Sequence, residues 1–361
     1  MHITPFKAYL PDLNKISFDD AFYKDLREHF NRVFKEGVFR ALNTPGYFII
    51  EIVDEGIRST GLITMTEIRD FQNKKILKHE QTIATKEKLH SLLFFERKAM
   101  IKPAALLIGT NSRLLRLLKN LKNKTTPALK LNFPDDSTSH AIWIINQTAD
   151  INKLTELFKH DVHKAIIADG HHRFATLSNR YLKSGKVNHS RILTAYFTRD
   201  QMAVSGFFRI IEKLKSTSHA AILNAIQKSC SAWSAVTEVE PKKGFIYLLV
   251  DQEKYRFKLK SKSRSQLLPL TFTKQILGPV FKIFNETKSK RIYYAESTHH
   301  LSLVDELTKS NPGKYIFILP PLTALDVLSN KKVLPPKSTF FLPRIINGLV
   351  VALDQAENRK D

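Results

Sequence analysis

The chain has almost no cysteine and no long apolar stretch. Its 361 residues include one cysteine, Cys230, which excludes an internal disulfide and is typical of proteins from a reducing compartment. No run of 18 or more apolar residues occurs, so the sequence predicts no membrane span. Residues 1–7 lack a basic region followed by an apolar one, which argues against a secretory signal. From these absences we expect a cytoplasmic protein.

Acidic residues are scarce relative to basic ones. The chain has 57 Lys and Arg against 34 Asp and Glu, a formal net charge of +23. This excess favours anionic partners, either nucleic acid or phosphorylated small molecules. The densest basic stretch, residues 113–130, has leucines at helical spacing and predicts a basic amphipathic helix. No zinc-finger spacing, aromatic RNA-binding signature or Arg-Gly tract accompanies it. Nucleic-acid binding without catalysis is therefore kept as an alternative.

A cluster of polar residues directly follows the apolar run 165–167. It reads Ala168-Asp169-Gly170-His171-His172-Arg173. The run and the Asp-Gly pair predict a strand ending at a turn, and the spacing of Phe174, Leu177 and Tyr181 predicts a helix after it. The first amides of a helix attract anions because they lack partners within the helix. The turn is thus a candidate phosphate site, with Asp169 beside it as a candidate metal ligand.

A second polar cluster lies earlier in the chain. It consists of Lys78-His79-Glu80-Gln81-Thr82, followed by Lys86-Glu87. Glu80 is a candidate general base, and Thr82 and Lys86 are candidate phosphate ligands. Charged loops of this kind are common, so the pattern by itself also fits a purely structural loop.

Predicted strands and helices alternate along the chain. Strands at 47–53 and 59–66 predict a hairpin, a helix is predicted over 217–231 with Cys230 buried on it, and residues 335–341 are predicted to form a loop. Because hairpins occur among the interleaved helices, we expect an α/β (α+β) fold with mixed sheets.

Taken together, these motifs resemble domain-of-unknown-function family 1015 (DUF1015), a bacterial and archaeal family. Its members carry a KHExT element, a KE pair, a proline before an apolar strand, a DGHHR turn and a PPKST segment followed by two aromatic residues. In this sequence these elements are Lys78–Thr82, Lys86-Glu87, Pro103, Asp169–Arg173 and Pro335–Pro343, after an opening Pro5-Phe6-Lys7. The resemblance spans nearly the whole chain.

A more distant resemblance is to the free-serine kinases with a ParB-like fold, which share the HEQ and DGHHR elements and a similar C-terminal segment. It implies a ParB/serine-kinase-like core. It also implies three catalytic residues. By this resemblance Glu80 is the general base, Asp169 is the carboxylate that binds Mg²⁺, and His172 is the third. The nucleotide- and phosphate-binding residues implied in this way are His79, Thr82, Lys86, Gly170, His171, Arg173, Lys337, Ser338 and Thr339.

The chain departs from these patterns at several positions. Ile83, His90 and Leu93 stand where DUF1015 members commonly have arginine, arginine and histidine. Phe340 and Phe341 stand where the kinases have an arginine and a histidine that hold the amino acid. Serine as the substrate is therefore not implied.

These observations predict a nucleotide-dependent small-molecule kinase, which transfers a phosphoryl group from ATP or ADP to a hydroxyl with the help of Mg²⁺. A nucleotide-binding or nucleotide-hydrolysing regulatory protein of ParB-like type is the main alternative. We expect an N-terminal region, 1–210, with the first two motifs. A C-terminal region, 211–361, is expected to return the Pro335–Thr339 segment to the same cleft.

Overall fold

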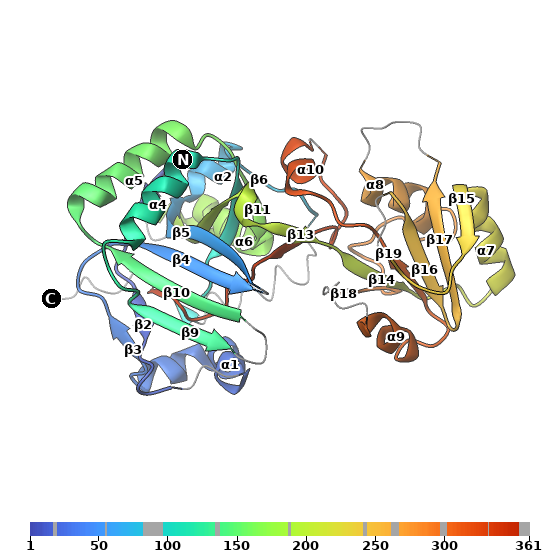
Figure 1. Ribbon diagram of the computed structural model, residues 1–361, viewed down its shortest axis with the longest axis horizontal. Coiled ribbons are helices and arrows are strands. Elements are labelled where there is room, and N and C mark those ends of the chain that lie inside the picture. The colour runs from blue at the N-terminus through green and yellow to red at the C-terminus, as the bar shows by residue number, and fades with distance from the viewer. Residues whose placement is uncertain are drawn as a thin grey trace. The chain divides into compact units, whose positions relative to one another are not determined.

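The computed structural model describes most of the chain as two compact units (Figure 1). The described residues are 1–16, 20–54, 56–81, 97–133, 138–186, 189–240, 244–260, 267–296, 302–330 and 332–353. The first unit comprises Met1–Lys78, Ala84–Ala203 and Pro343–Asp361, and the second comprises His79–Ile83 and Val204–Leu342. The chain therefore passes more than once between the units, and these bounds differ from the predicted regions 1–210 and 211–361.

The first unit is built on a nine-stranded mixed sheet. Its strand order is β6-β11-β8-β12-β5-β4-β10-β9, with β1 paired to β5. The pairs β11–β6 and β12–β8 are parallel, and the other pairs are antiparallel. The strands are β1 (Ile3–Thr4), β4 (Tyr47–Asp54), β5 (Ile57–Glu67), β6 (Ile76–Leu77), β8 (Ala104–Ile108), β9 (Leu129–Phe133), β10 (Thr138–Ile145), β11 (Ala165–Asp169) and β12 (Arg191–Thr198). Short pairs also join β2 (Tyr9–Pro11) to β3 (Phe39–Ala41) and β7 (Ala99–Met100) to β21 (Ala352–Leu353).

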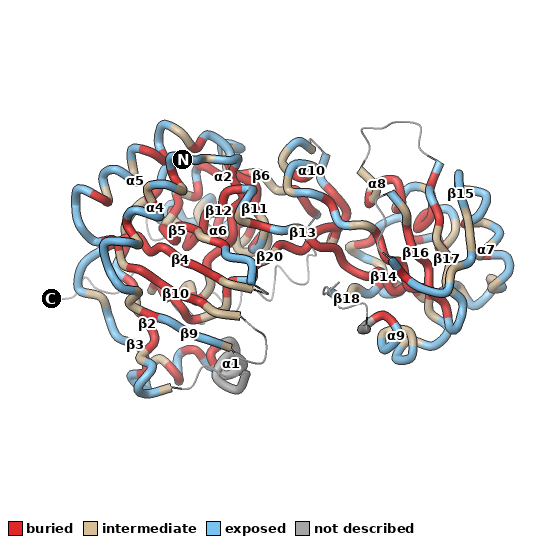
Figure 2. Tube along the Cα trace, in the orientation of Figure 1, coloured by how far each residue is buried: buried red, intermediate tan, exposed pale blue. Residues whose placement is uncertain are grey.

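Several helices of this unit bury apolar residues in the core of the sheet. The helices of the unit are α1 (Asp20–Lys35), α2 (Ile68–Gln72), α4 (Ser112–Lys122), α5 (Thr148–Asp161) and α6 (His171–Ser184), with a 3₁₀ turn at Arg199–Gln201. Leu114, Leu118 and Leu121 lie on one side of α4 and join the core of the sheet, as their spacing predicts. Phe174 and Leu177 place α6 in the same core. Figure 2 shows the buried segments following the central strands.

The second unit is built on a six-stranded antiparallel sheet of order β15-β17-β16-β19-β14-β18. Its strands are β14 (Phe207–Ile211), β15 (Cys230–Ala235), β16 (Ile246–Val250), β17 (Glu253–Leu259), β18 (Ile292–Glu296) and β19 (Tyr315–Ile318), and β13 (Ala203–Ser205) pairs separately with β20 (Phe340–Leu342). Its helices are α7 (His219–Lys228), α8 (Leu268–Phe272, followed by a π-helical turn at Thr273–Leu277), α9 (Ser302–Lys309) and α10 (Ala324–Ser329). Both faces of the sheet carry apolar clusters.

The predicted mixed α/β fold with interleaved helices is confirmed, and so are the hairpin β4–β5 and the strand and helix around residue 170. Two local predictions are wrong. The helix over 217–231 ends at Lys228, and Cys230 begins β15 because its backbone pairs with Leu259 of β17. Part of the predicted loop 335–341 belongs to β20, which pairs with β13. None of the helices in the described residues is long and apolar enough to cross a membrane.

His140 is a buried, uncharged histidine in β10. It is only 1% exposed, and its Nε2 lies 3.2 Å from the carbonyl oxygen of Arg344, to which it can donate a hydrogen bond. Burial lowers the pKa of His140 from 6.5 to about 4, although the hydrogen bond to the Arg344 carbonyl opposes this effect. Acid therefore protonates this side chain in the unfolded chain before it does so in the folded protein.

We expect His140 to make the protein less stable in acid. The unfolded chain binds a proton below about pH 6.5 and the folded chain only near pH 4, so the free energy of unfolding should fall by about 1.4 kcal/mol per pH unit between these values. Above pH 6.5 this group should contribute no pH dependence. Urea unfolding at a series of pH values measures the slope. His140→Gln should make it shallower, and the same change at exposed His163 should not. An equal slope in the wild type and His140→Gln would contradict the assignment.

Candidate functional site

In the first unit, the turn from β11 to α6 depends on a glycine. Gly170 has φ of +103° in the left-handed region and is the residue at the N-terminal cap of α6. A Cβ atom added there would lie 2.8 Å from Cβ of Ala104 and 2.9 Å from Nη2 of Arg173. Both the backbone conformation and the lack of space therefore favour glycine. The close approach brings the Arg173 side chain back over the turn.

Two cationic side chains meet at the carboxylate of Asp169. Nη2 of Arg173 donates to Oδ2 of Asp169 at 2.9 Å, and Nζ of Lys102 lies 3.4 Å from the same oxygen. Nη1 of Arg173 donates to the carbonyl oxygen of Lys102 at 2.5 Å. Antiparallel pairing of Asp169 with Ala105 of β8 places Lys102 beside the turn. The three side chains form one connected cluster, which we call the Asp169 cluster.

The charges of the Asp169 cluster act strongly on one another. Withdrawal from water would raise the pKa of Asp169, but Lys102, Arg173 and His171 together outweigh this effect and hold that pKa far below its usual range. The Asp169 side chain is still 56% exposed. The pKa of Lys102 is lowered, first by burial and then by Arg173 and Arg344, while Asp169 opposes the change. Asp169 is therefore an anion surrounded by cations.

His171 and His172 are the first two residues of α6, and both are half-buried. The N-terminal end of a helix carries partial positive charge and attracts anions. The donors around Asp169 do not fit a metal held by the protein alone, because Oδ2 already contacts two cations and Mg²⁺ prefers several oxygen ligands. Among the described residues no three His, Cys, Asp or Glu side chains gather at one point.

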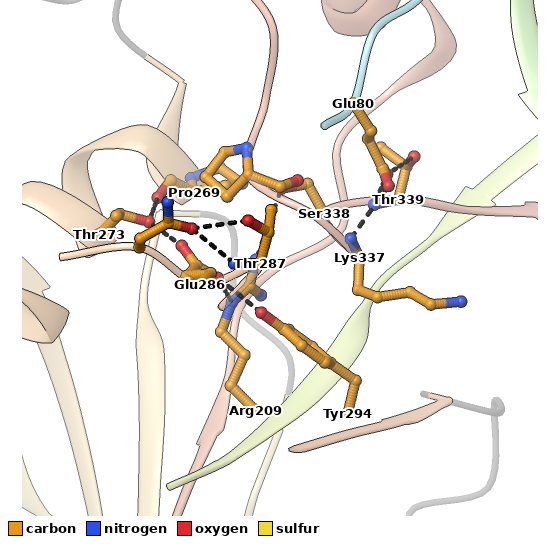
Figure 3. A network of polar contacts seen from close by, with 12 residues as sticks. Glu80, Arg209, Pro269, Thr273, Glu286, Thr287, Tyr294, Lys337, Ser338 and Thr339 are labelled. Carbon is orange, nitrogen blue, oxygen red and sulfur yellow. Dashed lines mark hydrogen bonds and ion pairs between the residues drawn. The ribbon is translucent and has the colours of Figure 1, made fainter. Parts of the chain in front are cut away.

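In the second unit, Glu80 is buried and its carboxylate binds the segment 337–339 (Figure 3). Oε1 accepts hydrogen bonds from the backbone N–H of Thr339 at 2.7 Å and from the Thr339 hydroxyl, and Oε2 accepts one from the backbone N–H of Lys337 at 3.0 Å. A parallel bridge between Glu80 and Leu334 fixes the neighbouring backbone. Both carboxylate oxygens thus hold the C-terminal segment in place.

The neighbours of Glu80 complete this arrangement. Nε2 of His79 lies 2.7 Å from Oγ1 of Thr339 and 3.4 Å from Oε1 of Glu80. Lys337 has φ of +56°, a conformation that a residue with a side chain seldom adopts. Its side chain extends away from the carboxylate in Figure 3, and its Nζ lies 4.5 Å from the centre of the Phe207 ring. This backbone conformation directs the N–H groups of Lys337 and Thr339 at Glu80, and the two hydrogen bonds compensate for its cost.

A buried ion pair lies next to Ser338. Nε of Arg209 is 3.8 Å from Oε2 of Glu286, and the two side chains are 1% and 2% exposed. Glu286 also accepts hydrogen bonds from the hydroxyls of Thr273 and Tyr294. Nη2 of Arg209 lies 3.5 Å from Oγ of Ser338, which in turn donates to the carbonyl of Pro335. The network therefore connects the core of the second unit to the 337–339 segment.

Residues 2–286 match the model of a family described as "Protein of unknown function (DUF1015)". The chain belongs to the DUF1015 family. No curated protein matches this DUF1015 chain significantly.

Several solved structures are similar to the DUF1015 chain at low identity. A conserved hypothetical protein from Pyrococcus furiosus is 13% identical with a TM-score of 0.42, covering 81% of this chain and 95% of its own. A free serine kinase in complex with AMP is 14% identical with a TM-score of 0.42, covering 79% and 88%. SbnI with a C-terminal truncation, from Staphylococcus aureus, is 10% identical with a TM-score of 0.44, covering 83% and 90%.

The predicted site residues of the DUF1015 chain fall into separate groups. Asp169 and Arg173 pair with each other in the first unit, on either side of the turn at Gly170. In the second unit, Glu80 contacts His79, Lys337 and Thr339, and Ser338 contacts Arg209. Thr82 and Lys86, together with the divergent positions Ile83, His90 and Leu93, lie outside the described residues. The roles assigned to all these residues, and the shared cleft, stay predictions.

Sequence reasoning missed three charged residues of these groups. The only sequence signal near Lys102 is its position directly before Pro103, and no pattern indicates Glu286. Arg209 had a usable signal, since it interrupts the apolar run 207–211, and a buried arginine needs an anionic partner.

The predicted basic helix is shorter than expected, and much of its charge is paired. It ends at Lys122 as α4, and residues from 129 onward form β9. Arg113 pairs with Asp161 at 2.9 Å, and Lys122 pairs with Glu51. A groove of about 700 Å³ beside α4 is lined by both signs of charge. This mixture does not favour a nucleic-acid surface.

Proposed function

We propose that this DUF1015 protein binds the phosphate groups of ATP or ADP at the turn between β11 and α6, and transfers a phosphoryl group to a hydroxyl of a small metabolite. The observation that carries the proposal is the position of the Arg173 guanidinium. Hydrogen bonds to Asp169 and to the carbonyl of Lys102 fix this guanidinium near the start of α6. A fixed guanidinium and the N-terminal end of a helix bind phosphate oxygens well.

The transfer itself requires mainly positioning and neutralisation of charge. The bond from the nucleotide's bridging oxygen to phosphorus breaks, a bond from the acceptor oxygen to phosphorus forms, and the acceptor proton passes to a base. The resemblance to the free-serine kinases supports this reaction, since the chain carries both the HEQ and the DGHHR elements. This resemblance implies that Glu80 is the base. Mg²⁺ bound to the nucleotide would screen its phosphate charge, and no step is assigned to a metal on Asp169.

A second candidate function is nucleotide binding or hydrolysis as a regulatory signal, without an acceptor. The hydrogen bonds of Glu80 favour it, because both carboxylate oxygens already accept hydrogen bonds from residues 337–339. A base must instead direct an oxygen at the substrate's proton. Incubation with labelled ATP separates the candidates. Transfer to one of a panel of hydroxy-amino acids and sugars supports the kinase, whereas phosphate release without an acceptor supports the regulator.

Arg173→Lys should weaken ADP binding by about 1–3 kcal/mol, since lysine cannot replace a bidentate guanidinium. Calorimetric titration with ADP measures the affinity, and thermal unfolding of the same sample measures stability. We expect a large loss of affinity with a small change in melting temperature. The exposed Arg32 of α1, which pairs with Glu36, provides the control, and Arg32→Lys should change neither quantity. Unchanged affinity in Arg173→Lys would contradict the proposed site.

A further inference from the structure

Lys102 belongs to the Asp169 cluster, although it was not among the site residues predicted from the sequence. Its Nζ and Nη2 of Arg173 approach the same carboxylate oxygen, Oδ2 of Asp169, at 3.4 and 2.9 Å. The Lys102 side chain is 29% exposed, so its ammonium is partly withdrawn from water yet accessible at the turn. One oxygen thus serves two cations, which leaves the local charge unbalanced.

The imbalance has a definite sign. Among the described residues of the cluster, Lys102 and Arg173 carry two positive charges against the single negative charge of Asp169, and Arg344 adds to the positive potential at Lys102. Cations that are partly withdrawn from water are costly unless an anion compensates them. A phosphate group, with up to two negative charges and three accepting oxygens, has the chemistry that this cluster lacks.

We propose that Lys102 is a direct ligand of the bound phosphate, and that Lys102 and Arg173 neutralise its charge in place of a metal held by Asp169. The inference rests on the proposed function and makes it more specific. Asp169 then serves to hold the two cations at the turn. A metal on Oδ2 would have to displace both of them, since each lies within 3.4 Å of that atom.

The test is calorimetric titration of the full chain with ADP, in Mg²⁺ and in EDTA. The wild type should bind ADP in both buffers with affinities within about fivefold of each other. Lys102→Met should weaken binding about 10- to 100-fold in both, as expected for the loss of one charge-assisted contact. Lys102→Arg, which keeps the charge, should restore most of the affinity.

Lys164 provides a matched control, because it is an exposed lysine just before β11 in the same unit. Lys164→Met makes the same change of charge and should bind ADP like the wild type. If Lys102→Met also binds like the wild type, or if wild-type binding requires Mg²⁺, the inference is overturned and the nucleotide site stands. If the wild type binds no ADP in either buffer, the proposed function itself fails. Thermal unfolding of each variant confirms that the titrated protein is folded.

Discussion

Replacing Arg209 with methionine should lower the free energy of unfolding by about 3–5 kcal/mol, the usual effect of leaving a buried charge without its partner. Glu286 would keep the hydrogen bonds from Thr273 and Tyr294. Its carboxylate would lose the cation that compensates it at 2% exposure. The 337–339 segment would also lose the contact between Arg209 and Ser338. Urea unfolding followed by circular dichroism measures the change.

Two further variants test whether the effect comes from the unpaired charge. Glu286→Gln added to Arg209→Met removes that charge while keeping groups that can hydrogen bond, so the double variant should recover about half of the lost stability. Arg32→Met breaks an exposed pair with Glu36, in which both side chains are at least 50% exposed, and should change stability by less than about 0.5 kcal/mol. A loss below about 1 kcal/mol in Arg209→Met would show that the pair contributes little.

Local signals in the sequence were sufficient to predict the turn at residue 170. The strand, the glycine and the helix there depend on neighbours within a few residues: a β-branched run, an Asp-Gly pair and apolar residues at helical spacing. Gly170 has a left-handed backbone, as a glycine in a tight turn often does. The basic helix was likewise predicted at its first turns, because Leu114, Leu118 and Leu121 set its buried side.

Features that depend on distant partners could not be predicted in this way. Strand β20 exists because it pairs with β13, and Cys230 is in a strand because β17 is available to pair with it. Lys102 reaches Asp169 through the register of β8 and β11. A spacing rule within one element cannot contain these relations, because each is set by the order of strands in a sheet.

The role of Glu80 illustrates the same limit at the level of chemistry. A glutamate in a charged motif is compatible with a general base, and that role is a prediction from the sequence. The structure adds that its oxygens accept hydrogen bonds from Lys337 and Thr339. No local pattern links residue 80 to those positions, although both belong to motifs shared with the family.

Glu80→Ala should lower the free energy of unfolding by about 3–5 kcal/mol. The change leaves the backbone N–H groups of Lys337 and Thr339 and the hydroxyl of Thr339 without their acceptor. A buried donor without a partner costs about 1–3 kcal/mol. The left-handed backbone of Lys337 would also lose the contact that compensates it. Urea unfolding gives the stability, and protease cleavage within 332–342 under native conditions reports whether the segment is released.

Glu80→Gln separates this holding role from catalysis. Its amide oxygen can still accept from Thr339, but its NH₂ group would face the N–H of Lys337, so we expect a loss of about 1–3 kcal/mol with the segment partly released. A glutamate that acts only as a base would behave differently. Its amide variant would keep wild-type stability and protease resistance while losing phosphoryl transfer to the acceptor.

If Glu80→Gln is as stable as the wild type, the hydrogen bonds to 337–339 do not hold the segment, and Glu80 is available for proton transfer. If stability falls and nucleotide hydrolysis without an acceptor persists, Glu80 holds the C-terminal segment and the proton of any acceptor must go to another group.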